Sequence, residues 1–238
     1  MFDFNGKVAM ITGASGNLGS AVTRAFHQAG AKLALIERSK GELEKMYPDL
    51  IGSADCTMSG CADLTDKEEV NGVVSAAIEH FDRIDVLVNT VGGYRAGSPL
   101  HETPLETFDF MLYLNARITY NISQAVIPYM LERGSGSIVH FSARPGLKGS
   151  ANQAAYSASK AAVLRLTESM SEEVKASGIN VNCILPGTLD TPQNRVASPD
   201  ADYGRWVQLE SIAGVVLFLC SDAAGDIHGA SIPVYGLS

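Results

Sequence analysis

Tyr156 and Lys160 are the residues whose types and spacing point most directly to chemistry. They lie four residues apart in the segment AAYSASKAA, so on a helix they share one face, about 6 Å apart along the axis. A tyrosine phenol ordinarily has a pKa of ~10, too high for proton transfer at neutral pH, and a close positive charge lowers it. The pair therefore predicts hydride-transfer chemistry, with Lys160 making the phenol usable. The alternative is a buried tyrosine beside an exposed lysine on an amphipathic helix.

A glycine-rich turn lies upstream, TGASGNLG at residues 12–19, directly after an apolar segment. In that context Gly13 permits a tight turn, the backbone of residues 15–18 approaches a pyrophosphate, and Gly19 lets the following helix pack closely on a sheet. We therefore predict a dinucleotide site here. The alternative is an ordinary strand-to-helix turn.

Glu37 and Arg38 follow the second apolar segment, beginning eighteen residues after Gly19. A carboxylate at this point accepts hydrogen bonds from the adenosine ribose and repels a 2′-phosphate, which favours NAD(H). An adjacent arginine would instead pair with that phosphate and accommodate NADP(H). We favour NAD(H). The alternative is a solvated charged pair at the end of a strand.

The elements that must position these residues alternate along the chain. Strand candidates lie at residues 8–12, 32–36, 54–62, 84–88, 137–142, 180–185 and 231–234. Amphipathic helical patterns lie at 18–29, 40–46, 66–81, 105–132, 153–176 and 207–221. This order predicts an α/β fold, a single doubly wound Rossmann-like domain over residues 1–238 with a seven-stranded parallel sheet and helices on both faces. The ligand crevice should lie at the carboxyl ends of the strands.

Composition and charge exclude several classes of function. Charged residues make up 18% and hydrophobic residues 46% of the chain, and the longest apolar stretch, residues 213–220, is too short to cross a bilayer. A net charge of −8 disfavours nucleic-acid binding. The sequence begins without an export pattern, so we expect a cytoplasmic protein. Its four cysteines lack metal-ligand spacing, and we expect buried free thiols and no metal at Cys56, Cys61, Cys183 and Cys220.

With these motifs in place, the chain resembles the short-chain dehydrogenase/reductase family over essentially its whole length. Asp63 in CADLTD resembles the family's adenine-contacting aspartate, and NTVG at residues 89–92 takes the place of its N-N-A-G motif. Asn115 in YLNARIT sits where the family has its active-site asparagine, and PGTLDT at residues 186–191 resembles its P-G-x-x-x-T segment over the nicotinamide.

The resemblance implies roles for individual residues. Tyr156 would donate or accept the proton, Lys160 would lower its pKa and bind the nicotinamide ribose, and Asn115 would hold a water of the proton relay. The dinucleotide would contact these two catalytic side chains and Gly13, Ser15, Gly16, Asn17, Leu18, Gly19, Glu37, Arg38, Asp63, Leu64, Asn89, Val91, Gly92, Pro186, Gly187, Leu189 and Thr191.

Three departures from the family pattern matter. Asn17 stands where the middle glycine of the turn is common, and its tolerance of left-handed backbone should preserve the turn. Thr90 and Val91 replace Asn and Ala in the N-N-A-G motif. The family's substrate-orienting serine, thirteen residues before the tyrosine, is Ala143 here. Ser142 is adjacent, but successive residues on a strand point to opposite faces.

The missing serine suggests a substrate that develops no oxyanion, such as a quinonoid ring. It suggests resemblance to one branch of the family, the dihydropteridine reductases, with a pterin-like C=N substrate stacked on Tyr94; this tyrosine could equally be packed on the domain. The alternatives are a carbonyl or alcohol oxidoreductase, in which another hydroxyl or a water replaces the serine, and a non-catalytic dinucleotide-binding regulator. The resemblance also implies a homodimer or homotetramer, formed through the predicted helices at 105–132 and 153–176.

Overall fold

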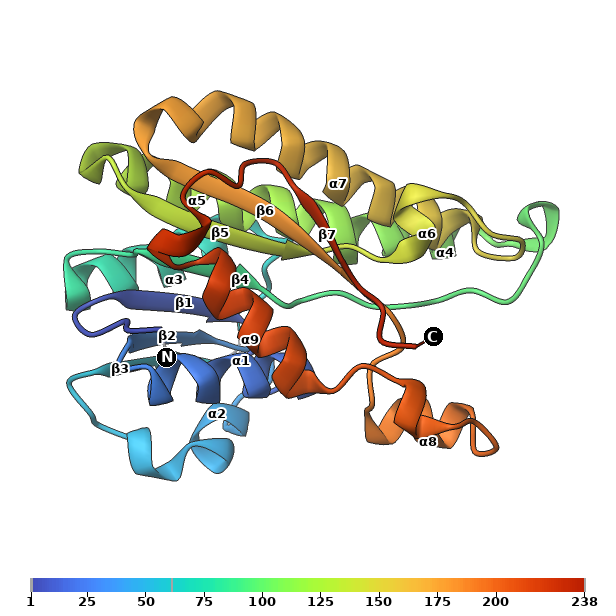
Figure 1. Cartoon of the computed structure of the whole chain (residues 1–238), viewed down its shortest axis with the longest axis horizontal. Coiled ribbons are helices and arrows are strands. Elements are labelled where there is room, and N and C mark those ends of the chain that lie inside the picture. The colour runs from blue at the N-terminus through green and yellow to red at the C-terminus, as the bar shows by residue number, and fades with distance from the viewer. Residues whose placement is uncertain (1, 61, 238) are drawn as a thin grey trace.

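A parallel β-sheet forms the centre of the computed structural model, which describes residues 2–60 and 62–237 (Figure 1). Within these residues the sheet has seven strands in the order β3-β2-β1-β4-β5-β6-β7. The strands are β1 (Val8–Thr12), β2 (Lys32–Ile36), β3 (Cys56–Ser59), β4 (Val86–Asn89), β5 (Gly136–Phe141), β6 (Ile179–Pro186) and β7 (Ser231–Val234). The order reverses between β1 and β4, which places the switch point there. The predicted doubly wound parallel fold is confirmed.

Helices cover both faces of this sheet. They are α1 (Asn17–Gln28), α2 (Glu42–Met46), α3 (Lys67–Phe81), α4 (Leu105–Met111), α5 (Ile118–Arg133), α6 (Arg144–Leu147), α7 (Ala154–Val174), α8 (Pro192–Ala197) and α9 (Leu209–Leu219). Among the helices of the described residues, none has the length and apolar character that a membrane span requires.

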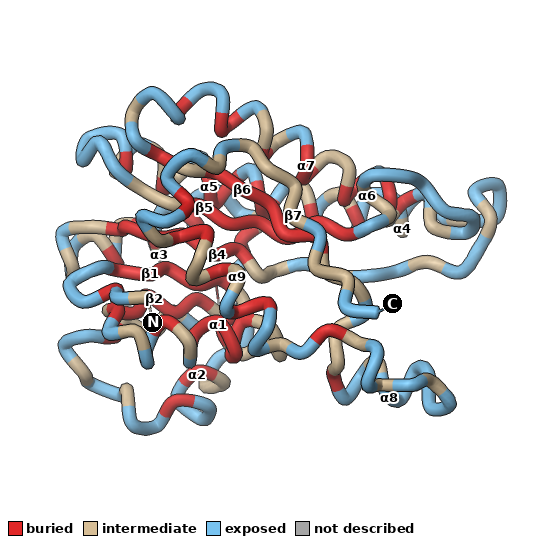
Figure 2. The backbone as a smooth tube through the Cα atoms, in the orientation of Figure 1, coloured by how far each residue is buried: buried red, intermediate tan, exposed pale blue. Residues whose placement is uncertain are grey.

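Two apolar layers hold helices and sheet together. Alternate residues of the strands, such as Ile11 and Leu35, pack against α1 and α9, while their neighbours, such as Met10 and Ile36, pack against α3, α5 and α7. Both faces of β1 and β4 are therefore buried, which is why these strands read as continuous apolar runs (Figure 2). The polar groups that can do chemistry are left to the strand ends.

The structure corrects several predicted boundaries. The predicted helix at 105–132 is divided by a π-helical segment, η3 (Leu112–Arg117), between α4 and α5. The predicted strand at 54–62 is shorter in the structure, where β3 covers only Cys56–Ser59. Helices α6 and α8 were not predicted, because segments of four and six residues are too short to show a helical period. Cys56, Cys183 and Cys220 are buried free thiols as expected, and Cys61 lies outside the described residues.

Candidate active site

Two adjoining clefts lie at the carboxyl ends of the strands, where the switch point predicts a ligand site. The first, which we call the nucleotide cleft, has a volume of about 860 Å³ and is lined mainly by the segments after β1, β2, β3 and β4. The second, the catalytic cleft, has a volume of about 830 Å³ and is lined mainly by the segments after β4, β5 and β6 and by α7. Asn17, Leu18, Thr90, Gly92, Leu189 and Thr191 line both, so the clefts are continuous.

The glycine turn forms the floor of the nucleotide cleft. Gly13 has a left-handed φ of +66°, which favours glycine. A Cβ on Gly19 would lie 2.0 Å from the carbonyl oxygen of Gly13, so only glycine fits this close approach of helix and turn. Asn17 is the first residue of α1 and has no left-handed φ. We expected Asn17 to be accepted because asparagine tolerates left-handed backbone, and this reason is wrong. The turn requires a left-handed residue at position 13 and not at position 17.

This turn also leaves a free helix end facing the cleft. Gly16 is the N-cap of α1 in extended backbone, and no side chain of the described residues caps the helix there. The first amide groups of α1 are therefore available to an anion. The Asn17 side chain instead donates a hydrogen bond to Gln193 Oε1 on α8 (2.8 Å).

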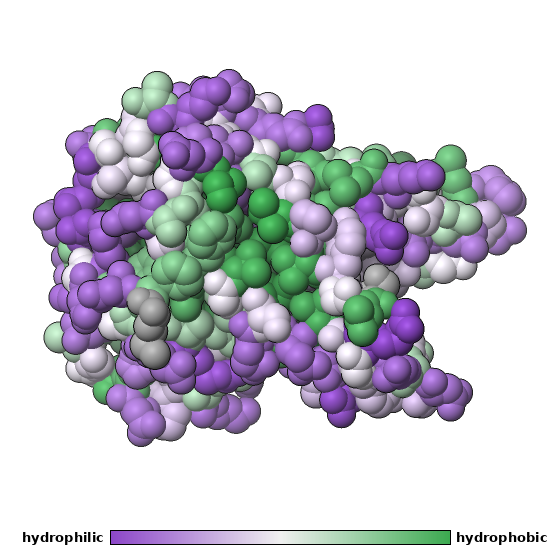
Figure 3. All heavy atoms as spheres, in the orientation of Figure 1, coloured by the Kyte–Doolittle hydropathy of each residue, from purple (hydrophilic) through white to green (hydrophobic). Residues whose placement is uncertain are grey.

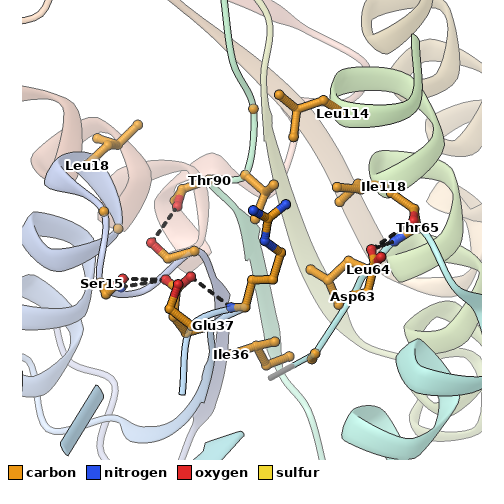
Figure 4. A pocket seen from close by; sticks show the side chains of 18 of the residues that line it. Ser15, Leu18, Ile36, Glu37, Asp63, Leu64, Thr65, Thr90, Leu114 and Ile118 are labelled. Atoms are coloured by element: carbon orange, nitrogen blue, oxygen red, sulfur yellow. Dashed lines mark hydrogen bonds between the residues drawn. The ribbon is translucent and has the colours of Figure 1, made fainter. Parts of the chain in front are cut away.

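Glu37 and Asp63 stand on different walls of the nucleotide cleft (Figure 4). The Glu37 carboxylate accepts hydrogen bonds from the amide and hydroxyl of Ser15, at 3.3 and 2.5 Å, which ties the end of β2 to the glycine turn. The Asp63 carboxylate accepts from the amide and hydroxyl of Thr65, at 2.9 and 2.7 Å. These bonds hold the pKa of Asp63 below its usual range. Hydrogen bonds therefore hold both carboxylates in a fixed direction.

Tyr156 and Lys160 lie one turn apart on α7, and both line the catalytic cleft. Lys160 is buried, and its Nζ donates a hydrogen bond to the carbonyl oxygen of Phe141 at the end of β5 (3.0 Å). Burial lowers the pKa of this ammonium to about 8, so it remains largely charged at neutral pH. The geometry thus keeps a cation at the base of the cleft.

Burial, with a smaller contribution from the nearby Tyr94, raises the pKa of the Tyr156 phenol to about 12. Desolvation dominates the pKa of this phenol, while the Lys160 ammonium is bonded to a backbone carbonyl; that Lys160 lowers the pKa of Tyr156 stays a prediction. The ring of Tyr94 lies edge-on to that of Tyr156, with centroids 4.8 Å apart. Tyr94 lines the catalytic cleft and is 63% exposed, so little of it is packed on the protein.

Asn115 lies in the π-helical segment η3 and is fully buried. Its amide group donates to the carbonyl oxygen of Gly93 (3.1 Å) and accepts from the Gly93 amide (3.0 Å), and it also donates to Ser159 Oγ (3.0 Å). A Cβ on Gly92 would lie 2.9 Å from Asn115 Oδ1 and 3.1 Å from Lys160 Nζ. Asn115 therefore fixes the loop after β4 against the lysine.

Ala143 occupies the place of the family's serine, buried at the start of α6 and lining the catalytic cleft. The neighbouring Ser142 also lines the catalytic cleft, but its hydroxyl donates to the carbonyl oxygen of Lys160 (2.8 Å). A Cβ on Gly146 would lie 2.6 Å from Ser142 Oγ, so α6 also closes over this hydroxyl. In this structure the Ser142 hydroxyl is therefore hydrogen-bonded to the backbone and not directed at a substrate.

The clefts bring together most of the predicted site residues. The nucleotide cleft is lined by Gly13, Ser15, Gly16, Asn17, Leu18, Gly19, Glu37, Arg38, Asp63, Leu64, Val91, Gly92, Leu189 and Thr191. The catalytic cleft is lined by Tyr94, Tyr156, Lys160, Pro186 and Gly187. Asn115 lines neither. Asn89 also lines neither, because its side chain is buried between strand and helix, accepting from Thr12 Oγ1 (2.6 Å) and donating to Thr119 Oγ1 (3.1 Å).

Several residues of the catalytic cleft were not identified from the sequence. They are Arg144 and Pro145 of α6, Gln193 and Asn194 of α8, Gln153, and Tyr235. Gln153, three residues before Tyr156, has a buried Oε1 without a hydrogen-bond partner among the described residues. The signal that could have found it is its place one turn before the tyrosine. The residues from α6, α8 and the C-terminal segment gave no local signal.

Comparisons with known proteins agree with this geometry. A family model described as short chain dehydrogenase matches residues 7–202. The chain is 33% identical to the 3-oxoacyl-(acyl-carrier-protein) reductase FabG of Thermotoga maritima and 35% identical to the 2-(R)-hydroxypropyl-CoM dehydrogenase of Xanthobacter autotrophicus, each over 97% of both chains. The crystal structure of an NAD⁺-bound xylitol dehydrogenase superposes with a TM-score of 0.89 at 30% identity, covering 98% of this chain and 99% of the other.

Proposed function

Because the chain belongs to the short chain dehydrogenase family and is an NAD(P)-dependent oxidoreductase, we propose that it reduces a small-molecule substrate with Tyr156 as the proton donor. When bound, the dinucleotide supplies the hydride. Tyr156 lies in the catalytic cleft, one helical turn from Lys160. A phenol at this point would give its proton to the reduced substrate, or take one in the reverse reaction.

The nucleotide cleft suits the cofactor. The uncapped amide groups of α1 would bind a pyrophosphate, as the family pattern implies. The close packing of Gly19 on Gly13 brings this helix end to the cleft. Lys160 would donate to the nicotinamide ribose, and Asn115 would keep the loop after β4 in place. We propose NAD(H) as the cofactor. Ser15 holds the Glu37 carboxylate in the nucleotide cleft, where it would repel the 2′-phosphate of NADP(H).

The alanine at position 143 is the observation that carries the choice of substrate. Loss of one hydrogen-bond donor to a developing oxyanion costs about 10²- to 10³-fold in rate, and the hydroxyl of Ser142 is bonded elsewhere. Reduction of a C=N bond in a quinonoid, pterin-like ring leaves the electron pair on nitrogen, which takes its proton from Tyr156 or from water. We therefore propose such a substrate, with the exposed ring of Tyr94 stacking on it.

A second candidate is a carbonyl or alcohol oxidoreductase. The named relatives include a 3-oxoacyl reductase and two dehydrogenases of hydroxylated molecules. The Gln153 side chain lines the catalytic cleft with an unpartnered amide oxygen, and its amide NH₂ could serve as the donor that Ala143 lacks. Turnover of simple ketones that falls in Gln153→Ala would favour this candidate.

We also propose that residues 1–238 form one domain, that the protein is cytoplasmic, and that it assembles as a homodimer or homotetramer. Exposed apolar side chains lie on α4, η3 and α5, at Leu105, Phe110, Tyr113, Tyr120 and Leu131, of which Phe110 and Tyr113 also line the nucleotide cleft. A second apolar surface is formed by half-buried residues of α9 and β7, namely Val215, Leu217, Phe218, Ile232 and Val234. Figure 3 shows an apolar patch over these two elements. Two separate surfaces of this kind support a tetramer.

The experiment that tests the proposal measures NADH and NADPH oxidation against quinonoid dihydropterin, quinones, imines and ketones. We expect turnover of the conjugated C=N substrate with NADH, and weak turnover of simple ketones. Tyr156→Phe should lose turnover while NADH binding, followed by fluorescence, is retained. Full activity in Tyr156→Phe would exclude the proton-donor role, and robust reduction of simple ketones with none of the pterin would exclude the proposed substrate.

A further inference from the structure

The catalytic cleft contains a positive charge that the proposed chemistry does not use. Among the described residues that line it, Arg144 and Lys160 are charged and none is acidic. Lys160 is bonded to the Phe141 carbonyl at the base of the cleft. This balance is unusual for a chain whose net charge is −8. Arg144 is therefore a cation in a cleft that offers it no carboxylate.

The position of Arg144 is fixed relative to the catalytic pair. Arg144 begins α6, and a Cβ on Gly146 in the same helix would lie 2.6 Å from Ser142 Oγ and 2.9 Å from the carbonyl carbon of Lys160. This close contact holds α6 against the turn of α7 that carries Lys160. The arginine is thus attached to a rigid part of the site.

The side chain of Arg144 is oriented but not neutralised. Its Cζ lies 5.1 Å from the centroid of the Tyr235 ring, which also lines the catalytic cleft. Such a contact holds a guanidinium without cancelling its charge. Arg144 is exposed and takes part in none of the ion pairs of the described residues. Asp190, before α8, is already bound by Arg195 through hydrogen bonds of 2.6 and 2.7 Å.

We propose that Arg144 binds an oxyanion group of the substrate, a carboxylate, sulfonate or phosphate, while the reducible group lies beside Tyr156. The planar guanidinium fork matches two oxygens of such a group. The cleft is open to solvent between the parts of the molecule that carry α6 and α8, seen as the hollow in Figure 3, so a charged molecule can enter. This inference rests on the proposed function only in taking the catalytic cleft as the substrate site.

The test compares isatin with isatin-5-sulfonate, two molecules with the same ring system that differ by one sulfonate. Calorimetry with the protein in the presence of saturating NAD⁺ measures both affinities and requires no turnover. We expect the sulfonate to bind about tenfold more tightly, the effect of one charge-assisted hydrogen bond. Arg144→Gln should remove this preference, and Arg144→Lys should restore part of it. The matched control is Lys148→Gln. Lys148 directly follows α6 and does not line the cleft, so this variant should keep the preference for the sulfonate.

Three results would overturn the inference. The first is equal affinity for the two probes, or binding of neither at millimolar concentration, in the unsubstituted protein. The second is a preference that survives in Arg144→Gln. The third is a loss of NAD⁺ affinity in Arg144→Gln as large as the loss of probe affinity, which would assign the arginine to the cofactor. Since these readouts need no catalysis, they are separate from the Tyr156→Phe test of the proposed reaction.

Discussion

Replacing Lys160 by methionine should stabilise the protein while it removes a group of the active site. The pKa of Lys160 falls from the ordinary 10.5 to about 8 because the ammonium is buried. At ~1.4 kcal/mol for each pKa unit, keeping this charge in the folded protein at pH 7 costs ~3 kcal/mol. The variant also leaves the Phe141 carbonyl without its partner, which costs ~1 to 2 kcal/mol. We expect Lys160→Met to be more stable by ~1 to 2 kcal/mol at pH 7.

The pH dependence gives an independent check. Below pH 8 Lys160 holds its proton in both the folded and the unfolded chain, so the buried charge destabilises the folded protein by its full amount. Between pH 8 and 10.5 the unfolded chain binds more protons than the folded one, and the stability of the unsubstituted protein rises with pH. We therefore expect the advantage of Lys160→Met to shrink by ~2 kcal/mol between pH 7 and pH 10.

Urea unfolding at fixed protein concentration without cofactor, followed by the fluorescence of the single tryptophan, Trp206, measures both quantities. Lys148→Met replaces an exposed lysine and should change the unfolding free energy by less than ~0.5 kcal/mol. A Lys160→Met protein that is less stable than the unsubstituted one at pH 7, with a difference that does not vary with pH, would refute the reasoning.

Three further outcomes follow from the site. Gly19→Ala must move the turn by about 1 Å, because its Cβ would lie 2.0 Å from the Gly13 carbonyl oxygen. The affinity for NADH, measured by fluorescence, should therefore fall more than ~10-fold. In the control Gly214→Ala, the new Cβ would have nothing within 4 Å, and NADH should bind normally. Glu37→Gln should lower the KM for NADPH relative to NADH by ~10-fold, and an unchanged ratio would remove the carboxylate from cofactor selection. The KM for NADH should rise as the pH passes about 8, where Lys160 loses the proton that it would offer to the ribose; a constant KM up to pH 10 would contradict that role.

The fold, and the set of residues that line the nucleotide cleft, could be predicted from the sequence alone. Both depend on local patterns: apolar strands buried on two faces, helices with a three- to four-residue period, and a glycine turn whose spacing allows one close backbone approach. The predicted strands from 8–12 to 231–234 all occur in the single parallel sheet, and Gly13, Gly19 and Glu37 line the nucleotide cleft. Such features are encoded by neighbouring residues, so no tertiary information is needed to predict them.

The electrostatic properties of the catalytic cleft could be read only from the folded structure. The pKa of Tyr156 depends on how deeply the phenol is buried, and the hydrogen bond of Lys160 depends on where β5 ends; neither is a property of the i, i+4 spacing. Likewise, α6 and Tyr235 come together from segments some ninety residues apart to leave Arg144 in a cleft without an acid. Desolvation and charge balance are sums over groups that meet only when the chain is folded, so the sequence pattern could place Tyr156 and Lys160 on one helix face but could not give their pKa values or the charge of the cleft around them.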